Sequence, residues 1–255
     1  MAVSAGSRPH GLTPGDRIHR LESVESTLDE IHRLAEEGAP DGTVVVAREQ
    51  TAGRGSRGRD WHSPPGGLWF SMLQRGSVIQ GSSVLSLRVG LAVALVIDRL
   101  GIRHPVTLKW PNDVMWCNRK LGGILCEARW LGGQREWVAI GIGINVANPL
   151  PEEMKRTAIR LDDLLPEVTP DDLVEPLAVR IRALSELGPT LSPQELGSFS
   201  ARDWLLGKKL HEPLQGTARG VTREGELLVE TQEGVVKAVR SGHVVLAEKR
   251  DLKVP

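Results

Sequence analysis

The chain reads Gln50-Thr51-Ala52-Gly53-Arg54-Gly55-Ser56-Arg57-Gly58-Arg59-Asp60-Trp61 shortly after an apolar run at residues 43–47. Glycine lets the backbone approach a ligand closely, and arginine offers planar, permanently charged donors for carboxylate and phosphate. The apolar run is rich in β-branched residues, which predicts a buried strand that leads into this loop. The stretch therefore predicts a loop that encloses an anion, although a solvated basic surface loop has the same composition.

Regular elements are expected on both sides of this loop. Upstream, Ser26 fits a helix N-cap with Asp29 three positions later, and an apolar helical stripe ends at Gly38. Downstream, residues 68–73 are expected to form the returning strand, and residues 147–169 a loop. Further helices are expected at residues 84–100, 171–187 and 193–206, and further strands at residues 106–110, 114–117, 121–129 and 136–146.

The 255 residues divide into three parts. Residues 1–16 are rich in serine, glycine and proline and are expected to be disordered. Residues 17–206 carry the elements above and are expected to form an α+β domain, a mixed and largely antiparallel sheet flanked by helices. Residues 207–255 change to short alternating strands cut by glycines, which predicts a small β-barrel. Its strands are expected at residues 216–222, 226–231, 234–240 and 243–247.

Composition excludes several classes of protein. The formal net charge is zero, so no global field attracts the chain to nucleic acid or to an anionic membrane, and any basic patch is local. No apolar run approaches the ~20 residues that span a bilayer, and the N-terminus lacks the apolar centre of a signal peptide. A cytoplasmic protein without membrane contact is expected. Cys117 and Cys126 are the only cysteines and form no metal-type or disulfide pattern, so no metal site is predicted.

Three further motifs follow the loop. They are Lys109-Trp110-Pro111-Asn112-Asp113, Arg119-Lys120-Leu121-Gly122-Gly123-Ile124-Leu125 and Gly141-Ile142-Gly143-Ile144-Asn145. Together with the loop, they resemble the biotin protein ligases in order and approximate spacing. The resemblance is strong over residues 20–150 and loose over residues 200–250. Each motif is weak alone, but four in series are highly specific.

The resemblance implies an enzyme with two steps. Biotin and ATP give biotinyl-5′-adenylate and pyrophosphate, with Mg²⁺ carried by the nucleotide. An acceptor lysine, expected on a biotin carboxyl carrier domain of a carboxylase, then attacks the mixed anhydride and releases AMP. The resemblance also implies a catalytic domain followed in the chain by an SH3-like C-terminal barrel. It implies the short form of the family, without an N-terminal DNA-binding domain and without a specific DNA operator, and it leaves a homodimer open.

The first step brings together two anions, the biotin carboxylate and the α-phosphate of ATP. Donors aimed at the developing charge offset this repulsion, and they are expected from loop amides, Arg54, Arg57, Arg59 and Lys120. By its residues alone, Lys120 fits a turn lysine in a hairpin, whereas the resemblance assigns it to the biotin carboxyl or the adenylate linkage. Asp113 is expected either to orient or deprotonate the acceptor lysine or to cap its own turn. The expected catalytic residues are Lys120, Arg54 and Asp113.

The fused rings of biotin need a few directional hydrogen bonds in an otherwise apolar slot. The resemblance assigns Ser26, Thr27 and Gln50 to the ureido group, since hydroxyl and carboxamide groups both donate and accept. Capping of its helix is the alternative role of Ser26, and Leu28 stands where the family often carries asparagine. The residues expected at biotin are Ser26, Thr27, Leu28, Gln50, Arg54, Gly55, Ser56, Lys120, Gly123 and Gly141.

The nucleotide is expected at Arg57, Arg59, Trp61 and Asn145. Trp61 resembles the family's aromatic residue that packs against adenine, although a tryptophan in a glycine-rich loop also fits an anchor to the core. Ser56 stands where family members commonly carry arginine. Either Ser56 or Arg57 is therefore expected to face the adenylate phosphate.

Two other functions fit parts of the pattern. A lipoate-type protein ligase shares the fold and the chemistry, but the matches at Ser26, Gln50 and residues 109–113 favour biotin. A nucleic-acid-binding module would use residues 54–59 and the C-terminal barrel. Zero net charge and a single basic loop argue against that function.

Overall fold

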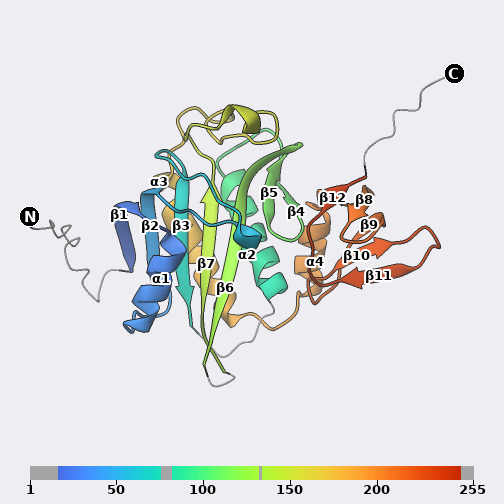
Figure 1. The fold of residues 1–255 in the computed structure, drawn as a ribbon, viewed down its shortest axis with the longest axis horizontal. Helices are drawn as coiled ribbons and strands as arrows, with labels where there is room; N and C mark the ends of the chain where they lie inside the picture. The colour runs from blue at the N-terminus through green and yellow to red at the C-terminus, as the bar shows by residue number, and fades with distance from the viewer. Residues whose placement is uncertain (1–16, 76–81, 132–133, 248–255) are drawn as a thin grey trace, which may run out of the picture.

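The structure is a computed structural model that describes residues 17–75, 82–131 and 134–247. The expectation of disorder at residues 1–16 lies outside the described residues. The described residues form two β-sheets, and helices flank the larger one (Figure 1). The α+β fold predicted from the sequence is confirmed.

The larger sheet has seven strands in the order β1-β2-β3-β7-β6-β5-β4. Its strands are β1 (Ile18–Val24), β2 (Val44–Gln50), β3 (Leu68–Gln74), β4 (Thr107–Lys109), β5 (Asp113–Trp116), β6 (Arg119–Leu131) and β7 (Gln134–Ile144). β1 and β2 are parallel, and all other neighbours are antiparallel. The sheet is therefore mixed and largely antiparallel, as predicted.

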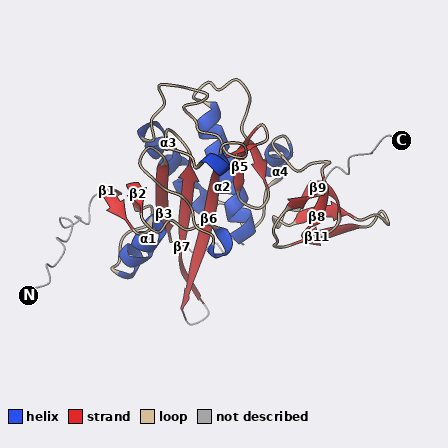
Figure 2. Cartoon of the chain, turned by 45° about the horizontal axis from the view of Figure 1, so that its top comes forward, coloured by secondary structure: helices blue, strands red, loops and turns tan. Residues whose placement is uncertain are grey.

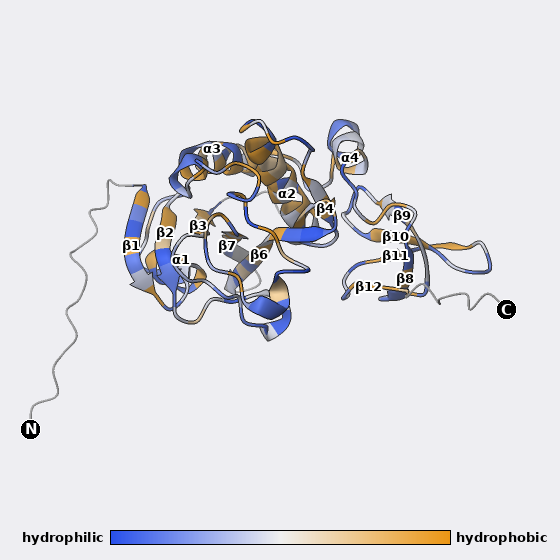
Figure 3. Ribbon diagram, turned by 90° about the horizontal axis from the view of Figure 1, so that it is seen from above, coloured by the Kyte–Doolittle hydropathy of each residue, from blue (hydrophilic) through white to orange (hydrophobic). Residues whose placement is uncertain are grey.

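Helices cover both faces of this sheet because successive strand side chains point to opposite faces. Val45 and Leu73 pack against helix α1 (Thr27–Glu36). Val44 and Met72 belong to the cluster on the opposite face, which also holds residues of α2 (Ser82–Asp98) and α3 (Asp171–Arg182). Figure 3 shows α1 on one side of the strands and α2 and α3 on the other, with α2 largely hydrophobic.

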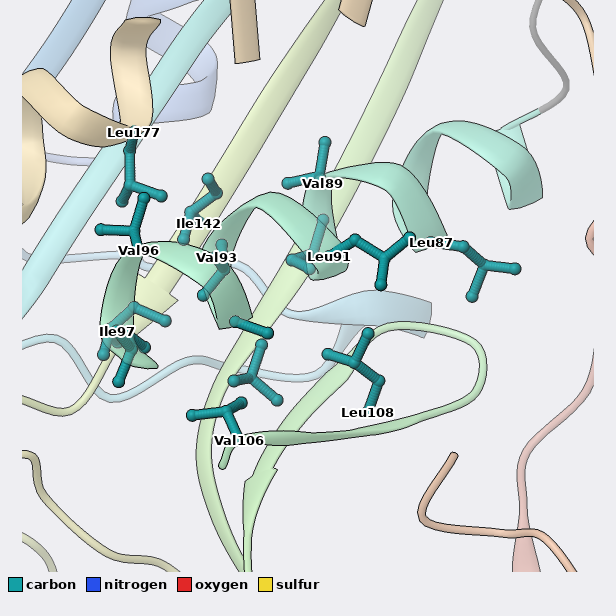
Figure 4. Packing of buried hydrophobic residues seen from close by; sticks show 14 of the residues in the cluster. Leu87, Val89, Leu91, Val93, Val96, Ile97, Val106, Leu108, Ile142 and Leu177 are labelled. Carbon is teal, nitrogen blue, oxygen red and sulfur yellow. The ribbon is translucent and has the colours of Figure 1, made fainter. Parts of the chain in front are cut away.

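Helix α2 is the centre of the larger core. Figure 4 shows Leu87, Val93 and Ile97 of α2 pointing into a layer that also contains Ile142 of β7 and Leu177 of α3. The helix is apolar around most of its circumference, which is expected for a helix buried between a sheet and other helices. Across the described part of the chain, no helix is both long and apolar enough to cross a membrane.

The C-terminal part forms a five-stranded sheet in the order β11-β10-β9-β8-β12, and it lies beside helix α4 (Pro193–Ser200) (Figure 2). Its strands are β8 (Lys209–Glu212), β9 (Gly216–Val221), β10 (Leu227–Glu230), β11 (Val236–Val239) and β12 (Val245–Leu246). Short 3₁₀ turns lie at Ser56–Gly58, Glu152–Met154 and Ala183–Glu186. The second, smaller β unit predicted from the sequence is present.

The structure differs from the expected elements in three places. Strands β1 and β8 were given no residue ranges, because neither shows clear alternation of apolar residues and few of their residues are buried. The helix expected at residues 193–206 ends at Ser200 instead. Beyond it the backbone turns to pair with β4, since Leu108 donates its N–H to Arg202 and Trp204 donates its N–H to Leu108 at 2.8 and 2.9 Å. Tertiary pairing here overrides local helix propensity.

Ser26 occupies the N-cap position of α1, but its side chain makes no capping hydrogen bond. The capping box expected with Asp29 is therefore absent. A genuine capping box is found at α4, where Ser192 and Glu195 bond reciprocally. Ser26 is 1% exposed, and its hydroxyl is left for another role.

An ion pair fixes α4 against α2 and yields a stability prediction. Arg88 is 2% exposed and bonds to Glu195 through Nε at 2.6 Å, with further bonds to the carbonyls of Gly188 and Thr190. Arg88→Met leaves these acceptors and the carboxylate without their donor, so we expect a loss of about 3 kcal/mol in the free energy of unfolding. Urea denaturation measures this loss. Arg99→Met, at an exposed position just after α2, is the control and should cost less than about 0.5 kcal/mol.

Candidate active site

A cavity of about 510 Å³ opens on the face of the larger sheet that also carries α1. Helix α1 starts beside it, the loop after β2 crosses over it, and β6 and β7 lie below it (Figure 1). The predicted site residues that line it are Ser26, Thr27, Leu28, Gln50, Arg54, Gly55, Ser56, Arg59, Trp61, Asp113, Lys120, Gly123, Gly141 and Asn145. Arg57 has φ 63° and an exposed side chain, and it is not part of the lining.

One end of the cavity is organised by hydrogen bonds between side chains. Gln50 Oε1 accepts from the backbone N–H of Thr27 at 2.8 Å and from its hydroxyl at 3.0 Å. Gln50 Nε2 donates to Ser63 Oγ at 2.8 Å, and Thr27 Oγ1 lies 2.7 Å from Ser71 Oγ. These bonds fix which way the carboxamide points, so Gln50 presents a defined donor edge to the cavity.

Glycines form the floor of the cavity. A Cβ on Gly141 would lie 2.8 Å from the side chain of Leu28, and a Cβ on Gly143 would lie 2.6 Å from Nε1 of Trp61. The indole of Trp61 also lies 3.4 Å from the Cβ position of Gly123. Its Nε1 is buried without a hydrogen-bond partner. Glycine is required at these positions because flat groups lie directly on the backbone of β6 and β7.

The loop over the cavity is a small hairpin. Trp61 donates its N–H to Gly53 at 2.8 Å, and Gly55 donates to Arg59 at 2.7 Å. Arg59 in turn bonds to the backbone and hydroxyl of Ser56. The guanidinium of Arg54, which the sequence predicted at the reacting anions, bonds in this structure to the carboxylates of two acidic residues outside the loop.

Lys120 lines the cavity. Its Nζ is 2.5 Å from Oδ1 of Asp113 and 4.9 Å from the ring centroid of Trp61. Lys109 Nζ lies 4.0 Å from the other oxygen of Asp113. Burial lowers the pKa of Lys109, with the Asp113 carboxylate opposing that shift. Asp113 is thus the counter-ion of Lys120 in this structure, a role that the sequence did not indicate.

Asn145 closes the far end of the cavity from β7. Its Oδ1 accepts a hydrogen bond from Nδ2 of Asn148 at 3.2 Å, and Oδ1 of Asn148 accepts from the N–H of Val146 at 3.1 Å. Both asparagines are almost fully buried. Because the oxygen of Asn145 is occupied, its amide N–H groups are the part available to a ligand.

The sequence matches two family models. Residues 20–145 match the Biotin/lipoate A/B protein ligase family, and residues 206–246 match the Biotin protein ligase C terminal domain. The chain is similar to the Bifunctional ligase/repressor BirA of Bacillus spizizenii, with 34% identity covering 88% of this chain and 72% of that protein. It is also similar to the Biotin--[acetyl-CoA-carboxylase] ligase of Mycobacterium tuberculosis, with 31% identity covering 95% and 91%. The chain belongs to the biotin protein ligase family.

The fold of this ligase agrees with that assignment. It resembles the biotin protein ligase from Aquifex aeolicus, solved in complex with biotin and ATP, with a TM-score of 0.75 and 29% identity. The alignment covers 90% of this chain and 98% of the Aquifex chain. The resemblance read from the four motifs is confirmed.

Several lining residues of this ligase were missed by the sequence analysis. Leu150, Met154 and Ala158 come from the segment at residues 147–169, which was expected to be only a loop. Apolar residues recurring in an otherwise polar loop were the available signal. Trp204 also lines the cavity, and nothing in its sequence context indicated this. Only the pairing of residues 202–204 with β4 brings it there.

Two lysines lie close to the ring of Trp204 at the edge of the ligase cavity. Nζ of Lys208 lies 2.9 Å and Nζ of Lys109 5.6 Å from its ring centroid. Burial, helped by the charge of Lys109, lowers the pKa of Lys208 to about 8. At a pH where Lys208 is protonated in both the folded and the unfolded protein, its buried ammonium therefore lowers the free energy of unfolding.

This shift predicts that the free energies of unfolding of Lys208→Met and the parent differ by an amount that depends on pH. Below pH 8 the folded parent carries the disfavoured charge, so the variant should be more stable by on the order of 1 kcal/mol, reduced from the full effect by solvent screening. The difference should shrink as pH rises from about 8 toward the unfolded value of 10.5. Urea denaturation across this range measures it, with Lys209→Met at the exposed neighbour as control. A difference that is independent of pH would contradict burial as the cause.

Proposed function

We propose that this cavity is where the ligase joins biotin to ATP and then passes biotin to a protein lysine. The enzyme is an ATP-dependent biotin protein ligase, and its substrates are biotin and ATP as the Mg²⁺ complex. The observation that supports the site is that Lys120 lines the same cavity as the hydrogen-bonded pair Thr27 and Gln50 and the amide of Asn145. A cation in the same cavity as recognition groups suits a reaction that joins two anions.

The end at α1 is proposed to hold the rings of biotin. The bonds between Thr27 and Gln50 fix the carboxamide so that its remaining N–H can donate to the ureido group, and the Ser26 hydroxyl is not used for capping. Leu28 and the glycine at position 141 give a flat apolar wall for the thiophane ring. The loop residues Gly55 and Ser56 also line the cavity, and the amide of Ser56 is proposed to meet the carboxyl end of biotin where it approaches Lys120.

The opposite end is proposed to hold the nucleotide. The N–H groups of Asn145 suit the acceptor nitrogens of adenine, and the loop arginine Arg59 also lines the cavity. Trp61 covers Gly143 and Gly123, so it provides a flat surface for the base or for the adenylate. Arg57 lies outside the lining, and a nucleotide contact by Arg57 would need the loop to change.

Lys120 is proposed to stabilise charge on the carboxylate and the α-phosphate while the oxygen–phosphorus bond forms and pyrophosphate leaves. In the second step the acceptor amine attacks the activated carbonyl, loses a proton, and AMP departs. Asp113 is the carboxylate within reach of this point, and exchanging its ion pair with Lys120 for a contact to the incoming ammonium would position the amine. Substrate charge entering beside Lys120 makes that exchange favourable.

The acceptor is proposed to be a biotin carboxyl carrier domain of a carboxylase, in the cytoplasm. The unpaired state of Cys117 and Cys126 supports a reducing compartment. Residues 17–206 are the proposed catalytic domain and residues 207–255 the proposed SH3-like domain. A homodimer is compatible with this arrangement. We propose no specific DNA partner, because the loop arginine Arg54 is already compensated by carboxylates.

The proposed activity has a direct test. Purified protein given biotin and MgATP should form biotinyl-5′-adenylate and pyrophosphate, detected by mass spectrometry and by pyrophosphate release. Lipoate in place of biotin should give at least tenfold less product, because it has no ureido group to pair with the remaining N–H of Gln50 and the hydroxyl of Ser26. Equal turnover of lipoate would favour the lipoate ligase alternative, and absence of both products would contradict the function.

Lys120→Ala should slow adenylate formation by about a hundredfold. The lost contact is charged and strengthens as charge develops, which is worth roughly 3 kcal/mol. Single-turnover formation of biotinyl-adenylate measures the rate. Lys237→Ala, at an exposed lysine of β11, is the matched control. A parent-like rate in Lys120→Ala would remove this residue from the adenylation step.

Position 56 gives a prediction about the intermediate. Ser56 lines the cavity and Arg57 does not, so an arginine introduced at position 56 would face the adenylate phosphate. Ser56→Arg should slow release of preloaded biotinyl-adenylate by about tenfold, from a charged hydrogen bond of about 1 to 2 kcal/mol. Dilution after preloading measures the release rate, and Ser56→Ala controls for loss of the hydroxyl. Unchanged or faster release from Ser56→Arg would show that position 56 does not reach the phosphate.

A further inference from the structure

A cluster of polar side chains lies beside the cavity and is separate from the groups assigned above. Nη1 and Nη2 of Arg54 bond to Oε1 and Oε2 of Glu127, both at 2.9 Å, which is a bidentate pair. Nη2 of Arg54 also bonds to Oδ1 of Asp29 at 2.7 Å. Behind Glu127, His32 Nε2 lies 3.2 Å from Oε2, and Trp137 Nε1 donates to His32 Nδ1 at 3.0 Å.

The chemistry of Trp137 gives this chain of bonds a direction. An indole N–H can only donate, so Nδ1 of His32 must accept. The proton of the neutral ring is then on Nε2, which donates to Glu127. Glu127 thus receives one bond from His32 and two from Arg54. These donors, with the His32 bond the largest cause, hold the pKa of Glu127 below its ordinary value and keep the carboxylate charged.

The charges show that Arg54 is not a free cation. Its single positive charge faces two carboxylates, Glu127 and Asp29, and both of its amino groups are occupied. The carboxylates raise the pKa of Arg54 against the effect of burial. An anionic ligand would have to compete with a bidentate carboxylate for this guanidinium. The geometry fits an anchor better than a ligand-binding group.

The anchor joins the parts that enclose the cavity. Asp29 and His32 are on α1, Glu127 is on β6 and Trp137 is on β7. Arg54 itself is in the loop, between the glycines at positions 53 and 55, and its backbone pairs with Asp60 across the loop hairpin. Trp137 is 5% exposed and belongs to the core under α1, so the chain of bonds begins at a fixed point.

We propose that Glu127, oriented by His32 and Trp137, is a positioning residue that holds the loop over the cavity through the guanidinium of Arg54. Glu127 does not touch substrate. It sets where the backbone amide of Ser56 lies, and hence how well the carboxyl end of biotin is bound. The activity readout of this proposal rests on the proposed function, whereas its proteolysis readout does not.

The two roles of Arg54 predict opposite effects of Glu127→Gln. If Glu127 anchors the loop, the variant should raise KM for biotin about tenfold in the adenylation reaction and change kcat less, because the binding geometry is loosened. If Arg54 instead binds the substrate anion, removing a competing carboxylate frees its guanidinium. KM would then be unchanged or lower, and that result would overturn the proposal.

A double-mutant cycle with Arg54→Met tests whether Glu127 acts through Arg54. In the Arg54→Met background, Glu127→Gln should change KM for biotin by less than twofold. Full additivity of the two changes would show that Glu127 acts independently of Arg54, contrary to the proposal. Glu36→Gln, on the same helix α1 with its carboxylate 3.9 Å from Arg129, is the matched control and should leave KM at the parent value.

Limited trypsin digestion gives a readout that needs no catalysis. Without substrates, cleavage after Arg57 and Arg59 should be about tenfold faster in Glu127→Gln than in the parent, because loosening of the loop exposes its backbone. Trp137→Phe removes only the indole N–H and should give a smaller increase of about two- to threefold. Parent-like cleavage in both variants would overturn the anchor. If the parent formed no biotinyl-adenylate, the proposed function would fail while this measurement still decided the anchor.

Discussion

The absence of side chains on one patch of β6 and β7 is the constraint on which the site depends. Gly123 and Gly143 pair directly across the two strands, and Gly141 pairs with Leu125 one step further along. A Cβ at position 143 would occupy the space of Trp61, and one at position 141 would meet Leu28. Glycine weakens a strand, because it has no side chain to pack. The glycines destabilise these strands locally, but they leave a flat floor on which rings can lie.

The rest of the fold offsets this local weakness. On the opposite face, Ile124, Ile140 and Ile142 alternate with the glycines and pack into the core under α2. On the cavity face, the residues of α1 from Leu28 to Ala35 pack against β2, β3 and β7. The cavity is therefore the part of the sheet that α1 leaves uncovered. The start of that helix and the loop after β2 are two of its walls, so the position of α1 contributes to the shape of the ligand site.

Motifs made much of the site predictable, because its residues lie in short contiguous stretches with unusual composition. The loop at residues 50–61 and the segments at residues 109–125 and 141–145 supply most of the lining. The exception within these stretches is Arg57, whose direction depends on a positive φ that composition does not reveal. The helix expected beyond Ser200 failed for the same kind of reason, since its local preference lost to a tertiary contact.

Residues that act through distant partners could not be predicted. Trp204 reaches the cavity only because residues 202–204 pair with β4, which no local pattern encodes. The partners of Arg54 are 25 and 73 positions away in sequence, at Asp29 and Glu127. Alone, each of these acidic residues fits a solvated surface charge, and an arginine in a glycine-rich loop fits a phosphate ligand. Only the fold shows that the carboxylates of Asp29 and Glu127 compensate the positive charge of Arg54. The loop therefore contributes less free positive charge than its composition suggests, and Lys120, Arg59 and the backbone amides remain as the groups available to the reacting anions.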